Sequence, residues 1–114
     1  MKPITFFYVV CYYTKFEEIS RRLDRLNMPH CYHSLLNYKN AAGYYRIWTC
    51  SQAKKPETIL TLSIGELIEE VVAITDFESA IQQMGFDGMK YLASNGNFEL
   101  SMNINEHIND FLFI

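Results

Sequence analysis

The stretch TFFYVVCYY, residues 5–13, decides the fold class because it is dense in aromatic and β-branched residues and carries no charge. Such a run is typical of a strand that is buried on both faces, so we expect it near the centre of a sheet. The next segment, residues 14–27, spaces its apolar residues at steps of three and four. This spacing predicts an amphipathic helix with Thr14 as its N-cap.

Two further strands follow that helix. Turn-forming residues occupy 37–43, and residues 44–50 after them are rich in aromatic and β-branched types, so residues 31–36 and 44–50 are expected to form two strands around a turn. This pattern is typical of a hairpin. The apolar run at residues 58–63 predicts another short strand.

The second half of the chain contains two capping-box patterns, in which Ser or Thr precedes Glu by three residues. Ser63 with Glu66 predicts a helix within residues 63–74, and Thr75 with Glu78 predicts another that ends at Gly85. The pair Asn95-Gly96 is a strong hairpin signal, so residues 89–104 are expected to form two paired strands. Residues 105–114 fit either a short helix or a last strand, and whether the terminal FLFI is core or interface stays open.

These elements predict an α+β fold. We expect one compact domain spanning residues 1–114, with a mainly antiparallel or mixed sheet of about five strands and two to three helices on one face. A chain of 114 residues is long enough to bury its own core.

The cysteines indicate a reducing compartment. Cys11, Cys31 and Cys50 are odd in number and two of them lie in apolar strands, so we expect reduced thiols in a cytoplasmic protein. The first apolar run is too short to span a bilayer and no small-x-small cleavage site follows it, so no membrane association is expected.

The residues His30, Cys31 and His33 are the most chemically suggestive cluster in the sequence. On a strand, residues two apart share a face, so only Cys31 and His33 can point to one place. Structural zinc needs four ligands, usually in two close pairs, and Cys11, Cys50 and His107 stand alone. We therefore predict no metal site, no cofactor and a structural role for this stretch.

The charge distribution is the most informative functional feature. Residues 1–56 carry nine Lys/Arg and three Asp/Glu, whereas residues 57–114 carry ten Asp/Glu and one lysine. Within one domain this asymmetry has two interpretations. The two halves can simply attract each other, or an acidic patch can remain available to a basic partner.

A small acidic domain without a catalytic motif is typical of proteins that act by binding. The leading hypothesis is a non-enzymatic inhibitor or immunity-type protein that blocks a basic nuclease, toxin or host-defence complex through its acidic surface. Tyrosines of the hairpin serve as anchors in this hypothesis. The predicted partner-binding residues are Glu66, Glu69, Glu70, Asp76, Glu78, Tyr44 and Tyr45.

Two alternatives from other classes remain. The first half interleaves basic and aromatic side chains, a mixture that stacks on single-stranded nucleic acid. The residues concerned are Tyr38, Lys39, Tyr44, Tyr45, Arg46 and Trp48. The other alternative is a small enzyme, which requires Cys31, His33 or His107 in a shared cleft. The oligomeric state stays open.

Overall fold

The computed structural model describes residues 4–95. The first half of these residues forms a strand, a helix and a hairpin, and the second half forms a helix, a strand and two further helices. The elements are β1 (Thr5–Tyr12), η1 (Tyr13–Lys15), α1 (Phe16–Arg25), β2 (His30–Leu35), β3 (Tyr44–Ser51), α2 (Pro56–Ile64), η2 (Gly65–Leu67), β4 (Glu70–Ile74), α3 (Phe77–Met84) and α4 (Phe86–Asn95).

The four strands form one antiparallel sheet in the order β2-β3-β1-β4. β1 is central, as its apolar sequence predicts. Tyr8 of β1 lies opposite Trp48 of β3 on one side and Val72 of β4 on the other. The described sheet thus has four strands where about five were expected, and the α+β class is confirmed.

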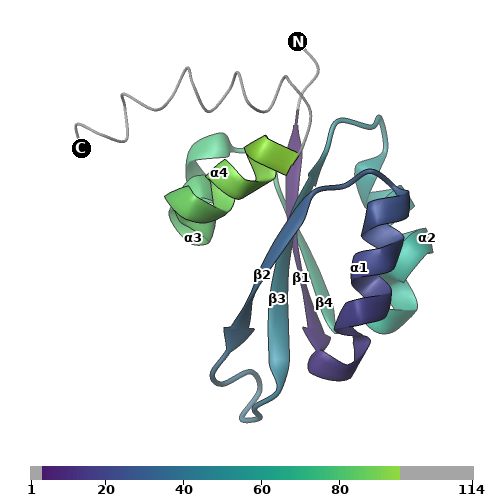
Figure 1. Ribbon diagram of the computed structural model, residues 1–114, viewed down its shortest axis with the longest axis vertical. Coiled ribbons are helices and arrows are strands. Elements are labelled where there is room, and N and C mark those ends of the chain that lie inside the picture. The colour runs from purple at the N-terminus through teal and green to yellow at the C-terminus, as the bar shows by residue number, and fades with distance from the viewer. Residues whose placement is uncertain (1–3, 96–114) are drawn as a thin grey trace.

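Helices cover both faces of the sheet, not one as expected (Figure 1). On one face, α1 and α2 bury a core that includes Phe7, Ile19 and Leu60. On the other, α3 and α4 pack over Phe6 and its neighbours and lie near one end of the sheet. The alternation of β1 serves both cores, because successive side chains of a strand point to opposite faces.

The predictions for residues 58–74 were wrong in element type. Residues 56–64 form a helix, α2, with a proline in its first turn, where the fixed φ of proline suits a helix start. Ile64 is buried at the end of this helix, and the strand β4 follows where a helix had been predicted. The expected Ser63–Glu66 capping box is absent, since Ser63 lies within α2.

The last described helices correct two further predictions. α3 ends at Gly85, as expected, with φ near 90°, but its N-cap is Asp76, whose carboxylate accepts from the Ser79 amide at 3.2 Å. Residues 86–95 form α4 where one hairpin arm had been predicted. The second arm, residues 105–114 and His107 lie outside the described residues. Thr14 was also a wrong cap, because it lies within η1 and α1 has no side-chain cap.

Candidate functional site

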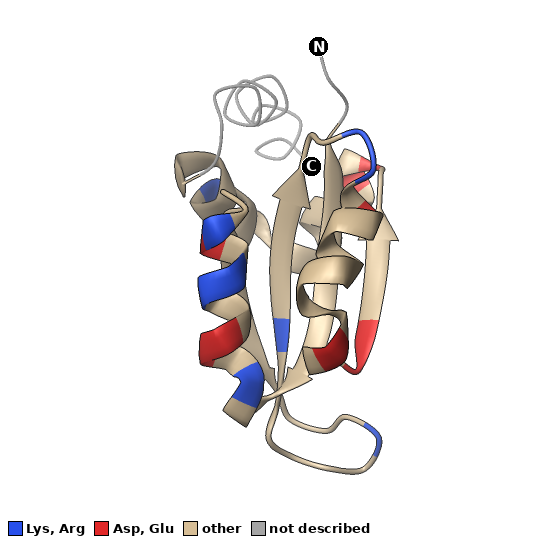
Figure 2. Ribbon diagram, turned by 90° about the vertical axis from the view of Figure 1, so that its right-hand side faces the viewer, with Lys and Arg blue, Asp and Glu red and all other residues tan. Residues whose placement is uncertain are grey.

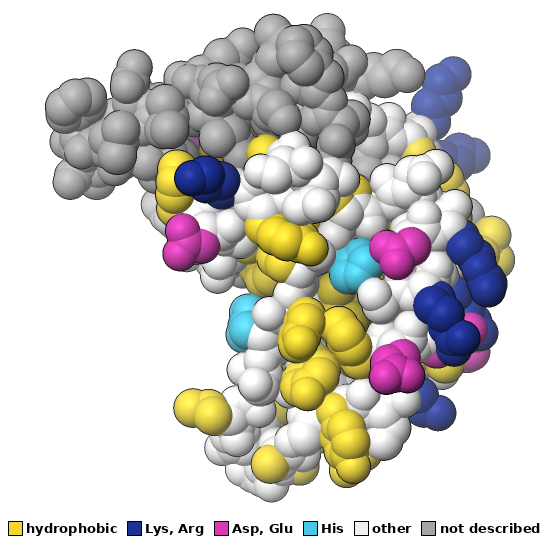
Figure 3. Space-filling view, in the orientation of Figure 1, with side chains coloured by type: hydrophobic (Ala, Val, Ile, Leu, Met, Phe, Trp, Pro, Cys, Tyr) yellow, Lys and Arg dark blue, Asp and Glu magenta, His cyan; other side chains and the backbone are white. Residues whose placement is uncertain are grey.

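A hollow of about 640 Å³ opens between α1, the start of β2 and α4. Figure 3 shows a histidine and a carboxylate side by side on this face of the molecule, with hydrophobic side chains gathered below them. The hollow is lined by Ser20, Asp24, Asn27, Met28, Pro29, His30, Tyr91 and Asn95. Polar groups from elements far apart in the sequence therefore meet here.

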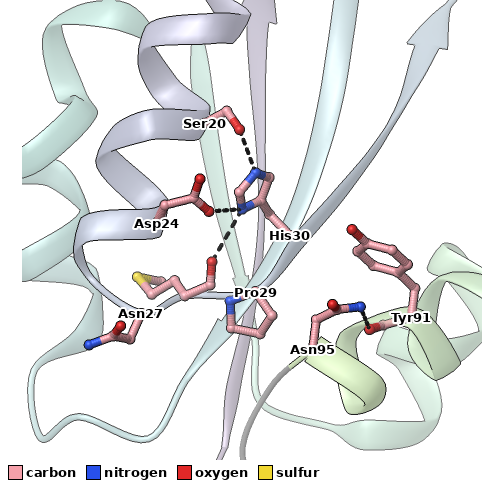
Figure 4. A pocket seen from close by; sticks show the side chains of 8 residues that line it. Ser20, Asp24, Asn27, Pro29, His30, Tyr91 and Asn95 are labelled. Atoms are coloured by element: carbon pink, nitrogen blue, oxygen red, sulfur yellow. Dashed lines mark hydrogen bonds and ion pairs between the residues drawn. The ribbon is translucent and has the colours of Figure 1, made fainter.

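His30 is the centre of this group (Figure 4). Its Nε2 lies 2.7 Å from the Ser20 hydroxyl, and its Nδ1 lies 3.2 Å from the Met28 carbonyl oxygen. The nearer Asp24 carboxylate oxygen is 3.9 Å from Nδ1. The imidazole is largely buried, with 12% of the side chain exposed, whereas Asp24 faces solvent. Ser20 therefore lies at one ring nitrogen of His30, and Asp24 lies near the other.

Sequence reasoning missed this cluster. It assigned His30 to a structural strand and Asp24 to the solvated face of the first helix, and it gave Ser20 no role, although the spacing of four residues puts Ser20 and Asp24 on one face of α1. No local motif joins α1 to β2, because the contact depends on how the helix packs across the sheet.

A second hollow of about 380 Å³ adjoins the first along β2 and shares Ser20, His30 and Tyr91 with it. Phe16 and Tyr32 line it and stack at 4.3 Å between ring centroids. Tyr45, one of the predicted partner residues, joins both rings at 5.3–5.5 Å. The second hollow is therefore continuous with the polar first hollow and is lined by aromatic side chains.

The side chains of Cys31 and His33 point to the other face of the sheet, as alternation predicts, and Cys31 also lines the second hollow. The Cys31 thiol contacts the Gly88 carbonyl of α4 at 4.0 Å, and burial raises the pKa of Cys31 to about 11. Partial burial, and then the Arg46 guanidinium, lower the pKa of His33. A protonated thiol beside a neutral imidazole with no hydrogen bond described between them is not an activated nucleophile.

The described cysteines should react slowly with thiol reagents in the folded protein. Burial raises the pKa of Cys11 to about 11 and that of Cys50 to about 12. At mildly alkaline pH, pKa values of about 11 to about 12 in place of the ordinary 9.0 lower the thiolate fraction by about 100- to 1000-fold. We expect disulfide-exchange labelling to be slow in the native state and rapid in denaturant. Fast native labelling of Cys31 would contradict this.

The predicted acidic residues divide between the two ends of β4. Glu66 pairs with Arg22 of α1, which also donates to the Ser63 carbonyl at 2.8 Å and to Glu18 at 3.0 Å. Figure 2 shows acidic and basic bands alternating along α1. Asp76 and Glu78 lie beyond the far end of β4, at the start of α3. Part of the charge asymmetry between the two halves of the chain is thus neutralised by ion pairs within the domain.

Acid should weaken the Arg22 network. Hydrogen bonds from Arg22 hold the pKa of Glu18 and of Glu66 below the ordinary 4.5. Because the folded pKa is lower than the unfolded one, the stabilisation is present above the unfolded pKa and is lost as pH falls through the folded pKa. We expect the fall in Tm between about pH 5 and pH 3 to be smaller in Arg22→Met than in the wild type. Equal slopes would contradict this.

The remaining predicted residues meet at the end of the sheet where β1 finishes. The Tyr38 hydroxyl donates to Glu70 at 2.9 Å, and Tyr38 packs on Tyr44 at 5.0 Å between centroids. Tyr44 contacts Tyr12 at 5.3 Å, and Tyr12 contacts Tyr13 at 4.8 Å. We call this set the tyrosine–glutamate surface. Its members are Tyr12, Tyr13, Tyr38, Tyr44, Glu69 and Glu70.

The basic and aromatic residues of the nucleic-acid hypothesis do not form one platform. Trp48 is 1% exposed and packs against Tyr8 at 5.2 Å. The Arg46 guanidinium stacks over the same Tyr8 ring at 4.3 Å. Tyr45 lies on the opposite face, against α1. A base could therefore reach only some of these side chains.

Within residues 4–95, no group of three or more His, Cys, Asp or Glu side chains is placed to hold a metal ion. In the same range no helix is long and apolar enough to cross a bilayer.

Comparisons with known proteins give only distant structural neighbours. No family model and no curated protein sequence matches the chain. One similar solved structure is CPII bound to ADP and bicarbonate from Thiomonas intermedia K12, with TM-score 0.47 and 9% identity over 65% of this chain and 90% of that one. A Bacillus cereus protein related to NIF3 gives TM-score 0.42 and 10% identity over 66% of this chain, which spans only 26% of that longer protein. A dimeric ferredoxin-like protein from Thermobifida fusca gives TM-score 0.34 and 7% identity, over 65% of this chain and 91% of that one. The β1–α1–β2–β3–α2–β4 order is itself the ferredoxin-like arrangement.

Proposed function

We propose that the protein is a binding protein that blocks a basic protein partner through the tyrosine–glutamate surface. The observation that carries the proposal is the hydrogen bond from Tyr38 to Glu70. It joins Tyr38 of the β2–β3 loop, which packs on Tyr44, to the acidic start of β4, so one surface contains both the anchors and the charges expected of such a protein.

The tyrosines suit an interface. Tyr13 is 52% exposed and Tyr12 is 40% exposed, so large aromatic area is open to a partner. Tyrosine is enriched among residues whose truncation weakens complexes most. The ring contacts within the set hold these side chains in place before binding, which reduces the entropy lost on association.

The electrostatics favour a cationic partner. Glu69 is exposed beside Glu70. Burial, and then the hydrogen bond to Glu70, raise the pKa of Tyr38 to about 12, so the phenol stays a neutral donor. Lys39 already lies 5.4 Å from the centre of the Tyr38 ring, the geometry in which aromatic rings attract cations. Lysine and arginine side chains of a partner find both carboxylates and ring faces here.

The proposed surface includes only some of the partner-binding residues that were predicted from the sequence. Glu69, Glu70 and Tyr44 belong to the surface, and Glu66 lies next to it in the chain but pairs with Arg22. Asp76 and Glu78 lie at the other end of β4 and Tyr45 packs against α1, so they are outside the proposed contact.

The test compares two charge reversals of the same kind. Glu69→Lys lies in the proposed surface, and Glu78→Lys lies outside it in the first turn of α3. Partners are captured from nuclease-treated host or phage-infected lysate and identified, and association rates are measured with each purified partner. We expect Glu69→Lys to lower the association rate by about tenfold at low salt, because complementary charges steer encounter.

The outcomes separate the alternatives. Equal effects of Glu69→Lys and Glu78→Lys, or no effect of either, would overturn the proposal. Capture that occurs only from a parallel lysate without nuclease treatment, with salt-dependent retention of single-stranded oligonucleotides by the purified protein, would replace it with nucleic-acid binding. Circular dichroism of each variant shows that folding is retained.

A further inference from the structure

The hydrogen-bond pattern around His30 fixes which of its nitrogens carries the proton. The Met28 carbonyl oxygen can only accept, so Nδ1 at 3.2 Å from it carries the hydrogen and donates. In the neutral imidazole, Nε2 is then the unprotonated nitrogen and accepts from the Ser20 hydroxyl at 2.7 Å. In this arrangement a base is hydrogen-bonded to a hydroxyl and is itself oriented by a third group, as in serine nucleophiles.

Ser20 departs from the usual behaviour of a helical serine. Within a helix, a serine hydroxyl commonly donates to the backbone carbonyl one turn earlier. Ser94 of α4 does so, donating to Lys90 at 2.9 Å. The hydrogen bond described for Ser20 goes instead across to β2, at the point where both hollows meet.

We propose that Ser20 is a nucleophile activated by His30 that is acylated by small uncharged carboxylic esters. This activity is separate from the proposed binding function, because it uses α1, β2 and α4 and no residue of the tyrosine–glutamate surface.

The reaction balances with these two side chains and water. Ser20 Oγ forms a bond to the ester carbonyl carbon while its proton passes to His30 Nε2. The bond from that carbon to the alcohol oxygen breaks, and the leaving oxygen takes the proton from Nε2. Water then gives a proton to Nε2 while its oxygen bonds to the acyl carbon. The bond from that carbon to Ser20 Oγ breaks, and Oγ takes the proton back from Nε2. The products are a carboxylic acid, an alcohol and the original serine.

Asp24 acts as a positioning residue in this scheme. Its carboxylate is 3.9 Å from Nδ1, beyond hydrogen-bond range but close enough to favour the imidazolium that forms during attack. The side chain is 72% exposed, so water screens that interaction and its effect is modest.

The linings of the two hollows define the substrate class. The residues that line them include no lysine or arginine, and one carboxylate is present, so anionic substrates are disfavoured. Phe16, Tyr32 and Tyr91 provide aromatic walls for an aryl or short alkyl group. The Tyr91 hydroxyl points toward the space beside His30 and can donate to a substrate oxygen (Figure 4).

The test uses p-nitrophenyl acetate as substrate and a fluorophosphonate as covalent probe. Release of p-nitrophenol is followed for the wild type, Ser20→Ala and Asp24→Asn, with Ser94→Ala as the control serine, and peptide mass spectrometry locates the acetyl or phosphonyl group. We expect modification at Ser20 and a rate lowered by about 100-fold or more in Ser20→Ala, because general-base activation contributes 10²–10⁴-fold. Ser94→Ala should match the wild type.

The variants His30→Gln and Asp24→Asn sharpen the result. His30→Gln should remove labelling of Ser20 while circular dichroism shows a folded chain, and if this variant unfolds, Ser20→Ala alone decides. Asp24→Asn should lower kcat by only a few-fold without changing KM, as expected of a positioning residue. Modification at Tyr91 or Tyr32, or equal rates in Ser20→Ala and the wild type, would overturn the proposal. Glu69→Lys should not alter this activity.

Discussion

Leu60→Ala will lower the free energy of unfolding by about 2–5 kcal/mol, whereas Leu62→Ala will change it by less than about 0.5 kcal/mol. Both leucines lie in α2, two residues apart. Leu60 is fully buried against the core under α1, and Leu62 is 80% exposed. Truncating the first leaves a cavity in a packed core, and truncating the second removes side-chain atoms that already face water.

Urea unfolding of the two variants and the wild type measures this difference directly. The pair also tests the element type, because residues two apart share a face on a strand but not on a helix. Similar losses in Leu60→Ala and Leu62→Ala would contradict a helix at Pro56–Ile64. If neither variant loses helical circular dichroism, the change in unfolding free energy comes from packing alone.

This segment shows why part of the fold was predictable and part was not. β1, α1 and the β2–β3 hairpin have clear periodicity, and each was predicted close to its observed bounds. The run at residues 58–63 is short and apolar, and a strand and a buried helix of this kind have the same composition. Pro56 was the available signal, since proline is common in the first turn of helices.

The helix prediction for residues 63–74 was wrong for a related reason. Ser63 and Glu66 match a capping box, but the pattern does not specify that a helix follows. In the fold, Val71 contacts the core under α1 and pairs with Val9, so burial beside the central strand decides the conformation of residues 70–74. Tertiary packing overrides local preference in such segments.

The candidate sites also have one part that was predictable from the sequence and one part that was not. Local reasoning correctly placed Cys31 and His33 on one face of a strand. It grouped Glu69, Glu70 and Tyr44 together with Glu66, Asp76, Glu78 and Tyr45, which lie outside the tyrosine–glutamate surface. The contact between Ser20 and His30 depends on the crossing of α1 over β2, which no spacing in the sequence encodes.

Leu92→Ala is the second substitution with a large expected effect, again about 2–5 kcal/mol of unfolding free energy. Leu92 is fully buried in the core that α3 and α4 form over the opposite face of the sheet. The exposed neighbour Lys90 provides the control, and Lys90→Ala should cost less than about 0.5 kcal/mol. On the hairpin arm predicted from sequence, residues 90 and 92 would share a face, so equal effects would contradict α4.

The two cores should respond independently, because they share no residue and lie on opposite faces of the sheet. Milder substitutions keep the chain folded while testing this. Ile19→Val on one face and Ile81→Val on the other should each cost about 0.5–1.5 kcal/mol. Their sum should match the double variant within about 0.5 kcal/mol, as for sites without shared partners. A larger discrepancy in urea unfolding would mean that the central strand transmits packing changes between the faces, so that a partner bound on one side could alter the hollow on the other.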